Sequence, residues 1–288
     1  MNNNSLLSHR NEEPENGILY IVGTPIGNLN DISYRALNIL KNVSLIACED
    51  TRQTKKLMSK YKFSNNLISF NNFNYIKKTP IILNELNLGK SVALVSDAGM
   101  PGICDPGEEL VRDAKFNGIN TICIPGPCAA LTALVSSGFS SSKFTFEGFL
   151  PKKLSEREVI LFEISKNEKT TILFESPHRL KKLLKELKVY LGGEREMQLY
   201  RELTKIFEEH VGNTINEVNE YFEDKEVLGE ITLVIKGVNK KNKTLDFDEC
   251  YLKKELNELI KAGLSLSQAS KYLARKNNLK KSVIYKMY

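Results

Sequence analysis

The sequence predicts an α/β protein with two α/β domains and a small helical module at the C-terminal end. Three observations lead to this prediction: apolar, β-branched runs alternate with helical patterns, several of these runs end in glycine or proline, and the last part of the chain is helical and basic. Alternating strands and helices indicate a largely parallel sheet. Such sheets place their ligands at the carboxyl ends of the strands.

The first predicted domain covers residues 17–120 and follows a polar segment, 1–16, which we expect to be a disordered leader. Its strands and helices come in pairs: "GILYIVG" with "NDISYRALNILKN", "SLIACED" with "TRQTKKLMSKY", and "SVALVSDAG" with "DPGEELVRDAKFNG". In the third pair we expect Asp105 to cap the helix, because Pro106 suits the first helical position and Glu108 stands three residues after the cap.

The second predicted domain covers residues 121–240. It begins with "NTICIPG" and "PCAALTALVSSG", continues through "FTFEGFL", "KTTILFESPHR" and "LKKLLKELKVYL", and ends with "GEITLVIKG". Ser155 and Glu158 are spaced as a capping box that opens a helix.

The helical module covers residues 245–288. It contains "YLKKELNELIKAG", a break at Gly263, and "SLSQASKYLARKNN", in which Ser265 and Gln268 form a second capping box. A helix-turn-helix is one arrangement that fits this pattern.

Composition excludes several classes of protein. The chain has 288 residues, of which 41% are hydrophobic, so it can bury a core, but no run approaches the roughly 20 apolar residues of a membrane span. The five cysteines are scattered without a CxxC pair, and there are only three histidines. We therefore expect a cytoplasmic protein with neither a disulfide framework nor a metal site.

The charge is distributed unevenly. The net charge is +6, and the whole excess lies after residue 240, where there are eleven Lys and Arg residues but only five Asp and Glu residues. Such a basic segment is either a solvated face or a phosphate-binding patch. The candidate RNA-binding residues of this segment are Lys271, Arg275, Lys276, Lys280 and Lys281.

The glycines do not match a nucleotide-binding motif. Thr24 and Pro25 stand between Gly23 and Gly27, so the dinucleotide fingerprint fails, and neither a P-loop nor a GxSxG elbow is present. Glycine and proline at several strand ends, as in "VGTPIGN", "SDAGMPG" and "IPGPCAA", indicate either ordinary turns or a crevice lined by main chain. The crevice suits a ligand that is neutral or zwitterionic.

Charged residues follow three of the predicted strands. The segments are "ACEDTRQT", "FESPHR" and "RELTKIFEEH". Each alone could be a helix cap or a surface ion pair. Together they suggest one functional cleft, whose charged residues are Glu49, Asp50, Arg52, Glu175, His178, Arg179, Arg201, Glu202, Lys205 and Glu208.

Eight segments, in order, resemble the bacterial 16S ribosomal RNA (cytidine 2′-O)-methyltransferases of the tetrapyrrole methylase superfamily. They are "YIVGTPIGNLNDIS", "ACEDTRQTKKL", "LVSDAGMPGICDPGEELV", "IPGPCAALTALVSSGF", "FEGFLP", "FESPHR", "RELTKIFEE" and "GEITLVIKG". The match covers about residues 17 to 237, and the tail resembles the C-terminal extension of that family.

The resemblance implies two α/β domains of the tetrapyrrole methylase type, a cofactor cleft between them that holds S-adenosylmethionine, and a homodimer. It places Phe174 and the segment 229–231 beside the adenine. Cys128 stands where the superfamily often has serine, which puts one cofactor hydrogen bond in doubt. The cofactor residues implied are Pro25, Asp97, Ala98, Gly99, Met100, Pro101, Cys128, Ala129, Phe174, Gly229, Glu230 and Ile231.

The activity implied is 2′-O-methylation of a cytidine in 16S rRNA of the 30S subunit. A 2′-hydroxyl is a weak acid, so a nearby base should help its attack. Our candidates are Asp50, then Glu49, then His178, while the phosphate contacts outside the tail would be Arg52, Arg179, Arg201 and Lys205. Two alternatives stay open: a methyltransferase acting on a tetrapyrrole or another small molecule, and an RNA-binding assembly factor without catalysis.

Overall fold

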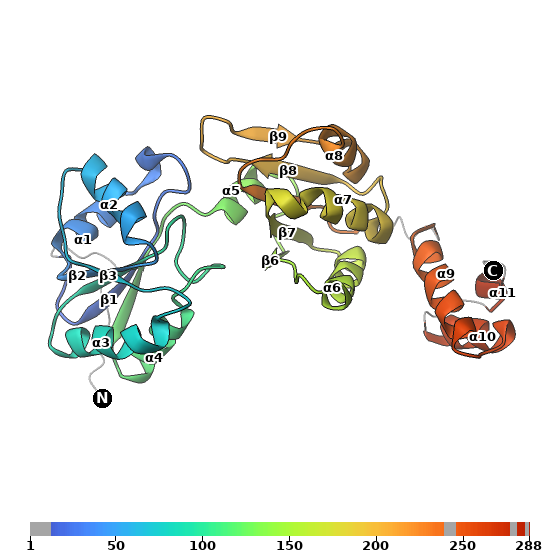
Figure 1. Cartoon of the computed structure of the whole chain (residues 1–288), viewed down its shortest axis with the longest axis horizontal. Helices are drawn as coiled ribbons and strands as arrows, with labels where there is room; N and C mark the ends of the chain where they lie inside the picture. The colour runs from blue at the N-terminus through green and yellow to red at the C-terminus, as the bar shows by residue number, and fades with distance from the viewer. Residues whose placement is uncertain (1–12, 239–245, 277–280, 286–287) are drawn as a thin grey trace. The chain divides into compact units, whose positions relative to one another are not determined.

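The computed structural model of the chain describes residues 13–238, 246–276, 281–285 and 288 (Figure 1). The chain divides into two compact units. The first comprises Met1–Thr132 with Glu202–Glu208, and the second comprises Ala133–Arg201 with Glu209–Tyr288. Of the predicted leader, residues 1–12 lie outside the described residues, and the carboxylate of Glu13 pairs with Arg35.

The first unit is built on a five-stranded parallel sheet, as the alternating pattern predicts. Its strands lie in the order β3-β2-β4-β1-β5. Their bounds are β1 Ile18–Val22, β2 Leu45–Cys48, β3 Leu67–Ser69, β4 Val92–Val95 and β5 Asn120–Ile124. Because β5 pairs with β1, this sheet extends past residue 120, where the sequence suggested a domain boundary.

Helices cover both faces of this sheet. They are η1 Leu29–Asp31, α1 Tyr34–Asn42, α2 Thr51–Lys60, α3 Tyr75–Asn87 and α4 Glu108–Phe116. Tyr20 packs with α1 and α2 in one buried cluster, while its neighbour Leu19 packs with α3 and α4 in another. Successive residues of a strand point to opposite faces, so the buried strand β1 needs apolar residues at every position. Figure 1 shows these two pairs of helices on either side of the strands.

The second unit contains a mixed five-stranded sheet in the order β6-β7-β10-β8-β9. Only β6 and β7 run parallel, and the other neighbours are antiparallel. Its elements are α5 Ala129–Ser137, which begins in the first unit, β6 Phe144–Phe149, α6 Leu154–Lys166, β7 Thr170–Glu175, α7 Pro177–Leu191, β8 Met197–Arg201, β9 Glu209–Val211, α8 Ile215–Phe222 and β10 Ile231–Ile235. One apolar core joins this sheet to α6, α7 and α8.

The C-terminal module consists of α9 Asp246–Lys261, α10 Leu266–Lys276 and α11 Lys281–Tyr285 around a small core of its own. The predicted capping box is confirmed: the amide of Gln268 donates to Ser265 Oγ (3.3 Å), and the amide of Ser265 donates to Gln268 Oε1 (3.2 Å). Within the second unit, Tyr251 of α9 stacks on Phe162 of α6 with ring centroids 4.3 Å apart.

Two predicted helix starts are wrong. Helix α4 begins at Glu108 rather than near Asp105, because the chain still turns through Gly107, whose φ of 146° is not helical. A Cβ at Gly107 would lie 2.9 Å from Leu94, so the chain passes too close to β4 for a side chain there. Helix α6 begins at Leu154, which puts Ser155 inside the helix, and the capping residue makes no side-chain bond.

Among the described residues, no helix is both long enough and apolar enough to span a bilayer.

Candidate active site

The loops after β1, β2, β4 and β5 leave the same edge of the first sheet. These four strands are parallel and adjacent, so their carboxyl ends lie side by side. This is the edge where open α/β sheets bind ligands. Eight of the predicted cofactor residues follow these strands: Pro25, Asp97, Ala98, Gly99, Met100, Pro101, Cys128 and Ala129.

Main-chain hydrogen bonds join the β1 loop to the β4 loop. The amide of Thr24 donates to the carbonyl of Gly99 (2.8 Å), and the amide of Gly99 donates back to Thr24 (3.1 Å). The buried Thr24 hydroxyl lies within hydrogen-bonding distance of the Ser96 carbonyl (3.3 Å). Gly99 has a φ of 80°, which glycine adopts without strain. The glycine of "SDAGM" is therefore required by the contact between the two loops.

The β1 and β5 loops touch through two glycines. A Cβ on Gly23 would lie 2.7 Å from the Cα of Gly126, and a Cβ on Gly126 would lie equally close to the Cα of Gly23. Real Cβ atoms do not approach main chain so closely, so neither position accepts a side chain without a shift. Small residues thus let three loops meet at the sheet edge through their main chains.

Three carboxylates gather where β2 and β4 end. The amide of Asp50 donates to Asp97 Oδ1 (3.0 Å), and the amide of Asp97 donates to Glu49 Oε2 (3.3 Å). Burial raises the pKa of Glu49 and that of Asp97, because the ionised forms lose contact with water. A carboxylate with a raised pKa is a better proton acceptor than an ordinary one.

Asp50 has different surroundings. It is the N-cap of α2, where its carboxylate accepts the Arg52 amide (2.8 Å) and pairs with the Arg52 guanidinium (2.6 Å). The hydrogen bonds from the Arg52 side chain and amide lower the pKa of Asp50 to about 2. The helix-cap interpretation of this residue is correct, and its carboxylate is a weak base in this state.

The segment Glu202–Glu208 belongs to the first unit although β8 and β9, which it connects, belong to the second. The Asn28 amide donates to Thr204 Oγ1 (3.0 Å), and a Cβ at Gly27 would clash with the Lys205 side chain. Lys205 also pairs with Glu202 (2.8 Å). Sequence reasoning missed Thr204, because nothing in a strand–loop–strand pattern indicates what the loop contacts.

The remaining predicted cofactor residues lie together in the second unit. Phe174 of β7 is opposite Thr232 of β10, and Ile231 is opposite Glu175. Phe174 also contacts Phe146 and Phe149 edge to face, with ring centroids 5.0 and 5.8 Å apart. The segment Gly229, Glu230 and Ile231 leads directly into β10. The structure therefore brings these four residues together on two paired strands and in the segment just before one of them.

Each predicted RNA-binding Arg or Lys outside the module forms an ion pair with a carboxylate of the protein. Besides the pairs of Arg52 and Lys205, Arg179 lies 3.4 Å from Glu175, and Arg201 lies 2.7 Å from Glu209. His178 is exposed near the start of α7.

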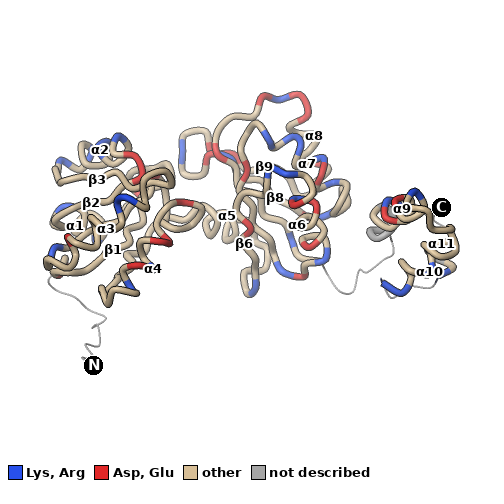
Figure 2. Tube along the Cα trace, turned by 60° about the horizontal axis from the view of Figure 1, so that its bottom comes forward, with Lys and Arg blue, Asp and Glu red and all other residues tan. Residues whose placement is uncertain are grey.

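Figure 2 shows the basic residues of the module along α10. Lys271 and Arg275 are exposed, Lys276 pairs with Glu255, and Lys281 donates to Ser267 (2.7 Å). Lys280 lies outside the described residues.

Comparison with known proteins identifies the family. The model of the family Tetrapyrrole (Corrin/Porphyrin) Methylases matches residues 18–219. The chain belongs to this family.

Curated relatives make the comparison more specific, since they match nearly the whole chain. Proteins named Ribosomal RNA small subunit methyltransferase I from Synechocystis sp. and Vibrio cholerae are each 42% identical over 271 residues, covering 94% and 93% of this chain and 97% and 93% of theirs. The protein of that name from Bacillus subtilis is 40% identical over 283 residues, with 96% of each chain covered. The resemblance seen in the sequence is thereby confirmed.

Solved structures support the fold of this tetrapyrrole methylase. A cobalt precorrin-4 methyltransferase superposes with a TM-score of 0.59 at 18% identity, covering 76% of this chain and 95% of its own. A uroporphyrin-III C-methyltransferase from Thermus thermophilus, complexed with S-adenyl homocysteine, gives 0.55 at 16% identity, covering 75% and 96%. The predicted fold class, with two α/β domains, is confirmed.

Proposed function

We propose that this chain transfers a methyl group from S-adenosylmethionine to the ribose 2′-oxygen of a cytidine in 16S rRNA. The observation that carries the proposal is the 40–42% identity, over more than nine-tenths of the chain, to proteins named Ribosomal RNA small subunit methyltransferase I. The tetrapyrrole enzymes named above share the fold at only 16–18% identity. An RNA substrate is therefore favoured over a tetrapyrrole.

The edge of the first sheet fits the cofactor. Small residues let its loops meet through main-chain contacts, and the Thr24–Gly99 hydrogen bonds fix the β4 loop in place. Such a surface can hold a zwitterionic ligand without a phosphate site. S-adenosylmethionine, when bound, supplies a methyl group on a positively charged sulfur. The role of these loops is to orient the acceptor oxygen toward that methyl group.

Glu49 is the base that the local chemistry favours. Its carboxylate has a raised pKa and lies at the end of β2, beside the β4 loop. Asp50 has a pKa of about 2 and holds Arg52, so we place it second. His178 of the second unit stays a third candidate. Glu49 would accept the 2′-hydroxyl proton as the oxygen attacks.

Lys271 and Arg275 of the module are the strongest RNA-binding candidates. Both are exposed, and neither pairs with a carboxylate among the described residues. The other four candidates would each have to leave their carboxylate partner to bind a phosphate, so we expect these contacts to form only when substrate is bound. They are Arg52, Arg179, Arg201 and Lys205. We further propose, from the family resemblance, that the protein acts as a homodimer in the cytoplasm.

The test is transfer of labelled methyl from S-adenosylmethionine to 30S subunits taken from cells that lack this protein. Naked 16S rRNA and a tetrapyrrole precursor serve as parallel acceptors. Label at a cytidine 2′-oxygen of the 16S rRNA is the expected result. Label only in the tetrapyrrole would assign the chain to small-molecule methylation, and RNA binding without label in any acceptor would favour an assembly factor.

A further inference from the structure

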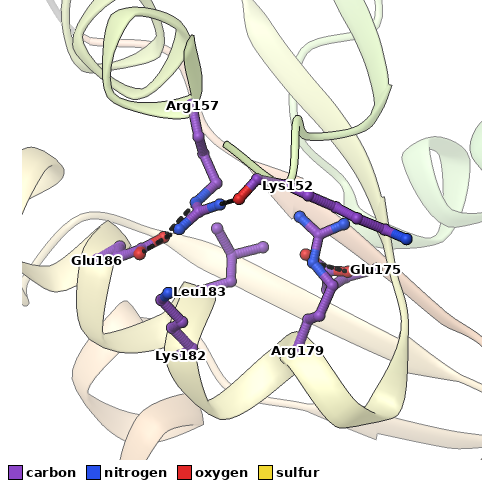
Figure 3. A pocket seen from close by; sticks show the side chains of 7 residues that line it. All are labelled: Lys152, Arg157, Glu175, Arg179, Lys182, Leu183 and Glu186. Carbon is purple, nitrogen blue, oxygen red and sulfur yellow. Dashed lines mark hydrogen bonds and ion pairs between the residues drawn. The ribbon is translucent and has the colours of Figure 1, made fainter. Parts of the chain in front are cut away.

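A small cavity lined mainly by charged residues lies in the second unit, at the end of β7 and between α6 and α7 (Figure 3). Its volume is about 170 Å³. It is smaller than the roughly 300 Å³ at which pockets for whole drug-sized ligands begin, so it suits one part of a larger molecule. Its lining residues are Lys152, Arg157, Glu175, Arg179, Lys182, Leu183 and Glu186.

Glu175, which lines this cavity, has an unsatisfied acceptor. The residue is only 2% exposed, and its Oε1 accepts the Ser176 amide (2.7 Å) and faces Arg179 Nε (3.4 Å). Its other oxygen, Oε2, is buried and has no hydrogen-bond partner among the described residues. Buried polar atoms are almost always hydrogen-bonded. The free oxygen therefore lacks a partner that a donor from another molecule could supply.

The cations around the cavity have two different roles. Arg157, which is 4% exposed, binds both oxygens of Glu186 (2.7 Å each) and the carbonyls of Pro151 and Lys152 (2.9 Å each), so it is part of the wall. By contrast, the ammonium groups of Lys152 and Lys182 are exposed and pair with no side chain in the described part of the protein. They are available to an anion.

We propose that this cavity is a subsite for one nucleotide of the RNA substrate. Glu175 Oε2 accepts an N–H from the exocyclic amino group of the base, and Lys152, Lys182 and Arg179 hold the adjoining phosphate. A carboxylate that accepts from a base amino group is a recognised means of reading cytosine, and phosphate contacts by Lys and Arg position the strand. This inference rests on the proposed RNA substrate.

A nucleotide explains the two halves of the site together. A phosphate by itself would leave Glu175 Oε2 unpaired beside a second negative charge. An amine by itself would meet two free ammonium groups of its own sign. Glu175 follows Phe174 in β7, so its side chain lies on the opposite face of the strand. The subsite is therefore separate from the surface at which the resemblance places the adenine of the cofactor.

The test compares the binding of CMP and UMP to the full-length protein without cofactor, by calorimetry or ligand-observed NMR. The two nucleotides share the ribose phosphate but differ at position 4 of the base, where CMP has an amino donor and UMP a carbonyl acceptor. We expect CMP to bind about tenfold more tightly. Glu175→Gln should remove this preference, because an amide can also donate to the carbonyl of UMP.

Two lysines of α7 provide a matched pair of controls. Lys182→Ala should weaken CMP and UMP alike by several-fold, whereas Lys185→Ala, an exposed change that does not line the cavity, should change neither. Thermal unfolding checks that each variant is folded.

Three results would overturn the subsite. These are equal binding of CMP and UMP, a CMP preference that survives in folded Glu175→Gln, and binding that is unaffected by Lys182→Ala. Inorganic phosphate that binds as tightly as CMP would likewise reject the base contact. Methyl transfer by the unaltered protein tests the proposed function separately, so a failure of that assay is not confused with a failure of the subsite.

Discussion

Two neighbouring carboxylates differ because their surroundings differ. Glu49 extends from the end of β2 toward the main chain of the β4 loop and is partly desolvated, whereas Asp50 caps α2 and is held by Arg52. Sequence alone put Asp50 first, although both residues follow the same strand. The distinction lies in hydrogen bonds and burial, which a linear pattern does not contain. In the proposed mechanism, Glu49 is the better proton acceptor because the carboxylate of Asp50 already caps α2 and pairs with Arg52.

The first prediction concerns the pH dependence of methyl transfer. As a base, Glu49 acts only when ionised, and its raised pKa moves the loss of turnover on acidification to a higher pH than for an ordinary glutamate. Glu49→Gln should lower kcat by roughly 100-fold or more and abolish that acid limb. A pH profile of kcat measures both.

Asp50→Asn is the matched variant for this prediction. Asparagine caps helices about as well as aspartate, so α2 should persist and kcat should fall by only a few-fold. A larger loss in Asp50→Asn than in Glu49→Gln would return the role of base to Asp50.

The second prediction concerns the buried pair of Arg157 and Glu186, whose side chains are 4% and 15% exposed. Glu186→Ala leaves the guanidinium buried without its carboxylate, so the free energy of unfolding should fall by about 3 kcal/mol. Glu156→Ala, which breaks an exposed pair with Lys153 at the start of α6, should cost less than about 1 kcal/mol. Urea denaturation compares the two, and equal losses would mean that burial of the pair contributes nothing.

At the scale of elements, the sequence predicted that several loops leave one edge of the sheet. It did not predict that their glycines are needed because the loops contact each other. The strands of the first sheet could be predicted because each is a continuous apolar run followed by turn residues. The helix caps at Asp105 and Ser155 failed, since a suitable residue caps only where the chain enters the helix. The contact of Asn28 with Thr204 joins residues 176 positions apart, which no local pattern reveals.

The third prediction tests the meeting of the β1 and β5 loops. Gly126→Ala places a methyl group against the main chain of Gly23, so it should destabilise the protein by about 1–3 kcal/mol and weaken binding of S-adenosylmethionine. Cys123→Ala, a change at an exposed position of β5, should do neither. Unchanged cofactor affinity in Gly126→Ala would show that this contact does not shape the cofactor site.

At the scale of the whole molecule, the excess of basic residues and the two sheets lie in different parts of the sequence. The net excess of basic residues lies after residue 240, in a module with its own small core. Its contacts with α6, including the pair of Lys254 with Glu158 (3.1 Å), involve none of the basic residues assigned to RNA. We therefore expect that changes to these basic residues weaken RNA binding and leave the two sheets folded.

The fourth prediction concerns this module. Removal of residues 245–288 should weaken binding to ribosomal RNA and leave binding of S-adenosylmethionine intact. In the full chain, Lys271→Ala with Arg275→Ala should reduce the slope of log K against log salt by about 0.7–0.9 for each phosphate that the protein no longer neutralises. Filter binding at several salt concentrations measures the slope. Loss of cofactor binding on truncation would instead make the module part of the folded core.

The path of the chain through the two units affects the order in which they can fold during translation. The chain leaves the first unit after Thr132, returns to it after Arg201, and leaves it again after Glu208. Domains generally fold as units, in order from the N-terminus, while a ribosome is still translating them. Here the Asn28 amide of the β1 loop bonds to Thr204. This hydrogen bond can form only after β6, β7 and β8 of the second sheet have left the ribosome. The nascent first unit must therefore remain incomplete at the edge proposed to bind the cofactor until late in translation.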